Sequence, residues 1–518
     1  MFPWRRKAAL APSGSGFDEK QSSASRGRLR AMGASILAIL TPDFLGSSAR
    51  ASAASGKPLG KTAYLDGLRG FAALMIYQQH NIDYAHPAQR DIIHHAFGWD
   101  GHKNFITFPF IRVFFHTGNL AVMLFFAISG YVTSVSLLKL VHSRDIGKVG
   151  QRIGVAIPQR FIRLWLPACM VSLTFMLCWH IFNIYPDGTH YPPANSFLAE
   201  IPRWIGNFFT KSYLFSKEAM RPNDIYDPHL WYIPLQMQAS VLTYIILLCM
   251  AAFGKYPASA RIWSMFALSI YFGYCVDSYF CALTTFGIMM ADIDILSGNG
   301  TLPRPFSYNV GKYFWYLPLL AGLWLSTCPS YTHTREFASD PGWYWLTYLH
   351  PRASSNAPHW YNAWAGVLVL LAIPRIPWLR SFFELGILRD FGKITFSFYL
   401  VQGPLLWTIG DRLYAAVGRI RPRSPELIPF WVNLFALPEW GPLGLEVNYL
   451  AANLLLFPFM VWIASIATKV FEGPSGQFCT WLFNPERSWE SKQENKDEAQ
   501  ESLLPMTEAR QPLAPVAS

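Results

Sequence analysis

Ten apolar segments constrain the fold of this chain more than any other feature of the sequence. A run of about 20 apolar residues forms a helix that crosses the ~30 Å hydrocarbon core of a bilayer. The segments cover residues 64–83, 113–138, 164–184, 230–253, 262–276, 279–295, 313–328, 361–379, 394–417 and 447–470. Charged residues make up only 14% of the chain, against about 25% in soluble domains. The sequence therefore predicts an all-α fold, a polytopic membrane helix bundle of about ten transmembrane helices.

The two ends of the chain differ in composition from the apolar segments. Residues 1–61 form a basic lead rich in Ser, Ala and Gly, and residues 473–518 form an acidic tail. Both are predicted to be mostly disordered and cytosolic, because they hold too few apolar residues to bury a core. The apolar stretch at 36–40 is broken by Thr41 and Pro42, so we favour a stretch on the membrane surface over a cleaved signal peptide. The membrane domain is predicted to cover residues 62–472.

Lysine and arginine are unevenly distributed among the connections. With the N-terminus in the cytosol, the connections at 139–163, 254–261, 296–312 and 380–393 are internal and carry most of these residues. This is the positive-inside pattern, although Arg419, Arg421 and Arg423 run against it. Because the number of crossings is even, both termini are predicted to lie in the cytosol. The protein is predicted to reside in an endomembrane or in the plasma membrane. The glycosylation sequon at Asn299 is then on the cytosolic side. The net charge of +11 then orients the bundle, and no nucleic-acid partner is needed to explain it.

The first crossing carries ionisable side chains at a depth where such groups are costly and are usually functional. It reads YLDGLRGFAALMIYQQHNID and includes Asp66, Arg69 and His80. Arg69 and His80 are separated by about three helical turns, so they share one face of the helix. His80 could act there as a general base on an acceptor hydroxyl. The equally weighted alternative is a structural Asp66–Arg69 pair near one interface and a hydrogen-bonded His80 near the other.

Two arginines precede the third crossing, in the segment QRFIRLWLP. Arg160 and Arg163 have the i, i+3 spacing that puts both guanidinium groups on one side of a helix start. Such a pair can bind the phosphates of a polyanionic donor such as coenzyme A. Anchoring of the helix by the positive-inside rule is the alternative, and residue chemistry alone favours it.

Polar residues also enter the fourth and ninth crossings. The segment DPHLWYIPLQMQAS places His229, Trp231 and Gln236 at membrane depth. An aromatic belt and hydrogen bonds between helices are the plain explanation for them. In the ninth crossing Gln402 precedes a Gly-Pro pair, a break that is tolerated only where it faces protein or a cavity.

The outer loop after the first crossing is rich in histidine. It holds His86, His94, His95 and His102. A zinc site is conceivable, but no paired cysteines and no H-E-x-x-H motif accompany these residues. No metal ligands are therefore predicted.

Taken together, these segments resemble the acyltransferase 3 family of integral membrane acyltransferases, in its fungal-type branch. The segment YLDGLRGFAALMIYQQH is similar to the family's opening signature, with Arg69 and His80 separated by ten residues. Five further segments resemble family motifs and occur in order along the chain: LFFAISGYVTS, QRFIRLWLP, LWYIPLQMQAS, TFGIMMAD and FSFYLVQGPL. The resemblance extends from about residue 62 to residue 470.

The resemblance implies an O-acyltransferase that moves an acyl group, often acetyl, from acyl-CoA to a hydroxyl of a carbohydrate, lipid or small-molecule acceptor. It implies His80 as the catalytic base, Arg69 as its partner or as a residue of the donor site, and Arg160 and Arg163 as the residues that hold the phosphates of CoA. Asp66 is grouped with the catalytic residues. Acyl-CoA is then a co-substrate, and no cofactor is bound permanently. The acceptor is expected to contact three further residues: Trp231, Gln236 and Gln402.

Two positions depart from the family's pattern. Related fungal sequences tend to have Glu where Gln236 stands, and the family commonly has His where Gln402 stands. Glutamine supplies no carboxylate and takes up no proton near neutral pH, so the changes could reduce or redirect activity. The two glutamines leave open a catalytically impaired relative that acts as a membrane scaffold. The buried polar residues and the broken ninth crossing leave open a transporter of small solutes.

Overall fold

A computed structural model describes residues 37–42, 59–184, 186, 192–216, 224–253, 256–303 and 311–483. The chain divides into two units, residues 1–57 and residues 58–518. The described part of the first unit is an exposed helical turn at residues 37–40 and the two residues that follow it. The rest of the predicted lead, and the predicted tail beyond residue 483, lie outside the described residues.

All regular elements in the described part of the chain are helices, so the all-α prediction is confirmed. Several shorter helices flank the main ones: α4 (Arg90–His94), α7 (Phe197–Ser212), α12 (Thr334–Phe337), α14 (Pro377–Phe383), α16 (Asp411–Ala416), α17 (Ser424–Leu427) and α19 (Gly473–Phe483). Each of the ten predicted apolar segments overlaps one main helix: α3 (Ala63–Ala85), α5 (Gly118–His142), α6 (Ile146–Ile181), α8 (Tyr232–Ala252), α9 (Ala258–Tyr274), α10 (Tyr279–Gly298), α11 (Tyr316–Ser326), α13 (Ala357–Ala372), α15 (Gly386–Leu405) and α18 (Val447–Ala467).

Several of these helices can cross a bilayer, as expected for a multi-pass membrane protein. Five helical runs in the described residues are long and apolar enough on their own: Gly118–His142, Ile146–Ile181, Pro228–Ala252, Tyr279–Gly298 and Val447–Phe483. A sixth span is formed if Ala357–Arg375 and Pro377–Phe383, which meet at a bend of 102°, are counted together. The count of ten crossings stays a prediction.

The helix that contains the third predicted crossing begins earlier than expected. A connection was expected over residues 139–163, but α5 ends at His142 and α6 already begins at Ile146. The Asp145 side chain caps α6, because its Oδ1 accepts a hydrogen bond from the Lys148 backbone N–H at 3.1 Å. The first turns of α6 are too polar to be detected by hydropathy, so Arg160 and Arg163 lie well inside a helix.

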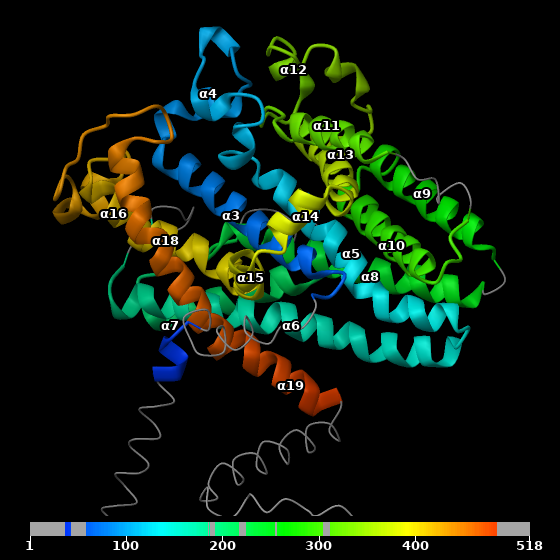
Figure 1. Cartoon of the computed structure of the whole chain (residues 1–518). Coiled ribbons are helices and arrows are strands. Elements are labelled where there is room, and N and C mark those ends of the chain that lie inside the picture. Colours follow the sequence, from blue (N-terminus) through cyan, green and yellow to red (C-terminus); the bar gives the residue numbers. More distant parts are fainter. Residues whose placement is uncertain are drawn as a thin grey trace, which may run out of the picture. The chain divides into compact units, whose positions relative to one another are not determined.

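The central helix of the second unit is α5, which contacts α3, α8, α10 and α13 (Figure 1). Glycine permits the closest of these contacts. A Cβ at Gly130 would lie 2.3 Å from the Thr284 carbonyl oxygen, and a Cβ at Gly287 would lie 2.1 Å from that of Ala127. Helices α5 and α10 therefore pack so closely that no residue larger than glycine fits at these two positions.

Beyond α18, the chain stays helical through the π-helical turn η14 (Thr468–Glu472) and α19. Helix α19 packs against α6, and its Ser475 hydroxyl donates to the Ile162 carbonyl oxygen at 3.5 Å. It covers the first eleven residues of the segment predicted as the acidic tail. The ordered part of the chain thus extends past the predicted boundary at residue 472.

Candidate active site

A cavity of about 340 Å³ lies among α3, α5, α6, α8 and α15. Its wall is mostly apolar with a few polar groups, which is typical of small-ligand sites. Six residues singled out by the sequence line it: Arg69, Arg160, Arg163, Trp231, Gln236 and Gln402. The fold therefore brings together side chains from four segments that are distant along the chain.

The two remaining predicted residues do not line the cavity. The side chain of Asp66 is 60% exposed, and its Oδ1 lies 3.8 Å from Nη1 of Arg69. An exposed pair at this distance is weak, so the structure leaves Asp66 outside the site. His80 lies directly behind the wall, because it contacts His229 and Gln402, which line the cavity.

Two histidine rings stack at this end of the cavity. The ring centroids of His80 and His229 are 4.0 Å apart, and the ring planes meet at 14°. Nε2 of Gln402 lies 3.2 Å from Nδ1 of His80, while its Oε1 is buried without a hydrogen-bond partner among the described residues. In this orientation the amide donates to Nδ1; turned by 180°, its oxygen would accept from Nδ1–H. Gln402 can thus stabilise either tautomer of His80.

His229 is fixed by its surroundings, although sequence reasoning gave it no role. Its Nδ1 lies 3.1 Å from Oδ1 of Asp227, and its ring stacks on Trp407 with the centroids 5.2 Å apart. The hydroxyl of Tyr399 donates to its carbonyl oxygen. Burial raises the pKa of Asp227 to about 8, so this carboxyl is mostly protonated at neutral pH. His229 therefore has a polar neighbour that does not carry a full charge at that pH.

Gly403 is the residue that lets α15 approach this pair. A Cβ at Gly403 would lie 2.7 Å from Nδ1 of His229 and 2.8 Å from Oδ1 of Asp227. We expect Gly403→Ala to displace His229 and to lower kcat/KM by about 100-fold, because a displacement of a site residue by about 1 Å can reduce the rate by this factor. Gly386→Ala is the matched control on the same helix, because a Cβ there meets nothing within 4 Å. Steady-state kinetics of both variants would check this, and equal activity would mean that the position of His229 is unimportant.

A chain of hydrogen bonds crosses the cavity wall between α5, α6 and α8. The Tyr232 hydroxyl donates to Oε1 of Gln236 at 2.6 Å, and Nε2 of Gln236 donates to Oγ of Ser129 at 2.6 Å. Arg160 donates from Nη2 to the same Oγ at 3.0 Å and from Nε to Oγ of Ser240 at 3.2 Å. Because Ser129 accepts two bonds, its own hydrogen is left to donate to a ligand.

The amide at position 236 has a role that a carboxylate cannot fill, since it accepts from Tyr232 and donates to Ser129. In Gln236→Glu the Ser129 hydrogen would turn toward the new carboxylate. We expect kcat to fall about tenfold, the effect of one lost hydrogen bond of ordinary strength. The thermal unfolding midpoint checks that the fold is retained. Unchanged kcat in a folded variant would remove Ser129 from the site.

Positive charge prevails along this wall. Among the lining residues of the described chain, Arg69, Arg160 and Arg163 face a single carboxylate, that of Glu472. Arg163 is exposed and Arg160 is half-buried, so the charge extends from the surface into the cavity. Oε2 of Glu472 accepts a hydrogen bond from Ser397 at 2.9 Å. An anionic ligand would be attracted to such a wall.

Comparison with known proteins identifies the family of this chain. The model of the acyltransferase 3 family, described as an acyltransferase domain, matches residues 62–469. The chain belongs to this family. The resemblance seen in the sequence is thereby confirmed, and this member of the acyltransferase 3 family is an acyltransferase with membrane-spanning helices.

Two fungal proteins are among the relatives of this acyltransferase. It is 25% identical over 418 residues to O-acetyltransferase PaAT-1 of Phomopsis amygdali, covering 73% of this chain and 78% of that protein. It is 24% identical over 417 residues to acyltransferase clz18 of Cochliobolus lunatus, covering 70% of this chain and 86% of that protein. No solved structure matches the chain.

Proposed function

We propose that the enzyme transfers an acyl group, with acetyl favoured, from acyl-CoA to a hydroxyl of a carbohydrate, lipid or small-molecule acceptor. The observation that carries the proposal is that one cavity is lined by three arginines and by His229, and that His80 stacks on His229 from behind the wall. The relative from Phomopsis amygdali is named an O-acetyltransferase, which supports an acetyl group and a hydroxyl acceptor.

The arginines suit the phosphates of CoA. Guanidinium groups bind phosphate through paired, charge-assisted hydrogen bonds. Arg69 and His80 lie eleven residues apart on α3, which corresponds to about 17 Å along the helix axis. A donor anchored at Arg69 and Arg163 needs an arm of comparable length to bring its thioester to the histidines, and the extended pantetheine group of acyl-CoA supplies one.

His80 is the proposed general base. When Gln402 accepts from Nδ1–H, the Nε2 lone pair is free and can take the proton of the acceptor hydroxyl. The hydroxyl oxygen forms a bond to the thioester carbon, the C–S bond breaks, and the sulfur leaves as the CoA thiol after receiving that proton. The products are an ester and CoA. His80 is partly exposed and does not line the cavity, so the acceptor is proposed to approach it from outside the donor's cavity.

Ser129 is the proposed donor to the negative charge that develops on the thioester oxygen. Its two accepted hydrogen bonds orient the hydroxyl, and one accepted bond comes from the cationic Arg160. A preoriented donor at such a position stabilises a tetrahedral intermediate more than water does.

The proposed orientation has the Arg163 end of the cavity in the cytosol, with both termini on the same side. Acyl-CoA is then supplied from the cytosol, and the acceptor meets His80 toward the far side of the membrane. In this orientation Asn299, which follows α10, carries no sugar. Mass spectrometry of the protein from a eukaryotic host tests this, and a glycan on Asn299 would reverse the orientation.

The direct test of the proposed reaction uses the purified protein in lipid nanodiscs. Release of the CoA thiol should require an acyl-CoA donor together with a cell extract that contains hydroxyl-bearing acceptors. Acetyl-CoA is expected to give the highest rate among donors of increasing chain length. Release of the thiol in the absence of an acceptor would contradict the proposal. The absence of thiol release with every donor would contradict it as well.

A further inference from the structure

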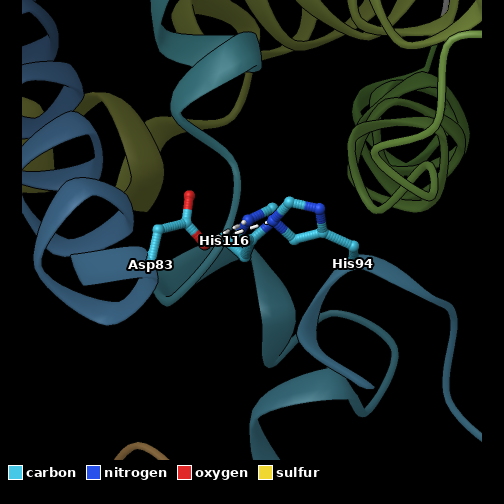
Figure 2. Close-up of side chains that lie close together, drawn as sticks. All are labelled: Asp83, His94 and His116. Atoms are coloured by element: carbon cyan, nitrogen blue, oxygen red, sulfur yellow. Dashed lines mark hydrogen bonds and ion pairs between the residues drawn. The ribbon is translucent and has the colours of Figure 1, made fainter. Parts of the chain in front are cut away.

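Three side chains with metal-binding atoms meet where α3 ends. Figure 2 shows Asp83 of α3 beside His94 of α4 and His116, which precedes α5. Oδ1 of Asp83 lies 3.3 Å from Nε2 of His94 and 3.2 Å from Nε2 of His116. The three ligand atoms all lie within 4.8 Å of one another.

The histidines of this loop do not form one group, as a loop-wide zinc site would require. His86 binds Glu446, with Nε2 3.1 Å from Oε2, and His95 binds Asp340, with Nδ1 2.9 Å from Oδ1. Only His94 of the four predicted loop histidines joins the cluster, and its partner His116 lies on a later segment. The sequence offered no signal for this pair, because the contact depends on how the loop folds back.

The distances fit a metal ion. Zinc binds histidine nitrogen and carboxylate oxygen at about 2.0–2.2 Å in tetrahedral geometry, which sets neighbouring ligand atoms about 3.3 Å apart. The two measured separations from Asp83, 3.2 and 3.3 Å, agree with this value. Two histidines and one carboxylate are also the ligand types that suit zinc, and three protein ligands leave a fourth position open.

The supporting contacts hold the ligands in place. The carbonyl oxygen of His94 accepts from the Ser330 backbone N–H at 2.9 Å and from Nη2 of Arg112 at 3.2 Å. Nδ1 of His116 lies 3.4 Å from Oγ of Ser330, an acceptor of the kind that metal-bound histidines use on their other nitrogen.

One nearby charge opposes a cation. Arg112 is buried, and its Nη2 lies 3.5 Å from Nδ1 of His116. Its guanidinium group is charged at neutral pH. However, it faces Nδ1, whereas Nε2 of the same ring points at the cluster, and the negative charge of Asp83 lies on the cluster side. The repulsion is therefore partly offset where the ion would bind.

We propose that Asp83, His94 and His116 bind one divalent transition-metal ion, zinc by their ligand chemistry. The ion would tie the outer loop and the start of α5 to the end of α3. Asp83 is three residues beyond His80 and on the same helix face, so the ion would also fix the wall next to the proposed base. The metal proposal does not depend on the role assigned to His80.

The test measures zinc in protein purified through a tag without histidine. We expect about one zinc ion per chain in the wild type and in His102→Ala, a loop histidine outside the cluster. His116→Ala and Asp83→Asn should retain about a tenth of this amount or less, because each removes one of three ligands. Zinc content that is unchanged in both variants would overturn the proposal.

A second measurement on the wild type alone guards against variants that fail to fold. After removal of metal with a chelator, added Zn²⁺ should raise the thermal unfolding midpoint, since a ligand that binds only the folded state stabilises it. Added Co²⁺ should give the visible absorption of a tetrahedral site. If the stripped protein binds neither ion and its midpoint does not move, the three side chains form a hydrogen-bonded cluster without metal.

Discussion

His80→Ala is expected to lower acyl transfer by about 10²–10⁴-fold, the usual contribution of a general base. The reason is the geometry around the ring, which Gln402 contacts at Nδ1 and His229 covers by stacking. Removing the ring removes the only group in the proposal that takes the acceptor proton. The rate of acyl ester formation at saturating donor measures the effect.

Two comparisons separate this role from a structural one. The affinity for acyl-CoA should be unchanged in His80→Ala, since the donor is proposed to bind through the arginines. His102→Ala should retain full activity, because His102 lies outside both the cavity and the metal cluster. A full rate in His80→Ala would remove it from the mechanism, and a larger loss in His229→Ala would make His229 the base.

Arg163→Gln combined with Arg69→Gln is expected to raise the KM for acyl-CoA by about 10–100-fold, the worth of one charge-assisted hydrogen bond or two. Both arginines line the cavity, and Arg163 is exposed, so its replacement leaves the core intact. Arg160 is the less suitable residue for this test, because it also holds Ser129 and Ser240.

The donor itself supplies the sharpest control for this prediction. An acyl thioester of N-acetylcysteamine lacks the phosphates of CoA, so its KM should be the same in the wild type and the double variant. Arg152→Gln is the matched protein control, since Arg152 is exposed on α6 but does not line the cavity. Equal losses with both donors would mean that the arginines act on folding and not on phosphate.

Much of the fold could be predicted, because the thickness of the bilayer fixes the length of an apolar segment that can cross it. The segment predicted at 279–295 became α10 (Tyr279–Gly298), and the one at 447–470 became α18 and the turn η14. The errors fall where polar residues continue a helix. Helix α6 starts eighteen residues before the predicted segment at 164, because capping by Asp145 and not hydropathy sets its start.

The candidate site was predictable to the extent that its residues belong to family segments. Arg69, Arg160, Arg163 and Gln236 were chosen one by one, and the fold joins them in one cavity. Asp66 was chosen for its place in the same segment, but it points to the exposed side of α3.

The missed residues depend on contacts between distant parts of the chain. The stacking of His229 on His80 joins residues 149 apart and needs Gly403 to let α15 come close. Neither the spacing of residues along the chain nor their hydropathy predicts such a contact. The same holds for His94 and His116, which a folded loop brings to Asp83.

Acyl-CoA is proposed to provide the acyl group, and His80 is proposed to enable its transfer to a hydroxyl. The test uses cells that lack the gene and express either the wild type or His80→Ala in its place. Isotope-labelled acetyl-CoA is added to membranes and extract from these cells. Mass spectrometry then follows the label into small molecules, lipids and carbohydrates. We expect a labelled acetyl ester that appears with the wild type and is absent with His80→Ala. The same labelled ester in equal amount with both proteins would contradict it.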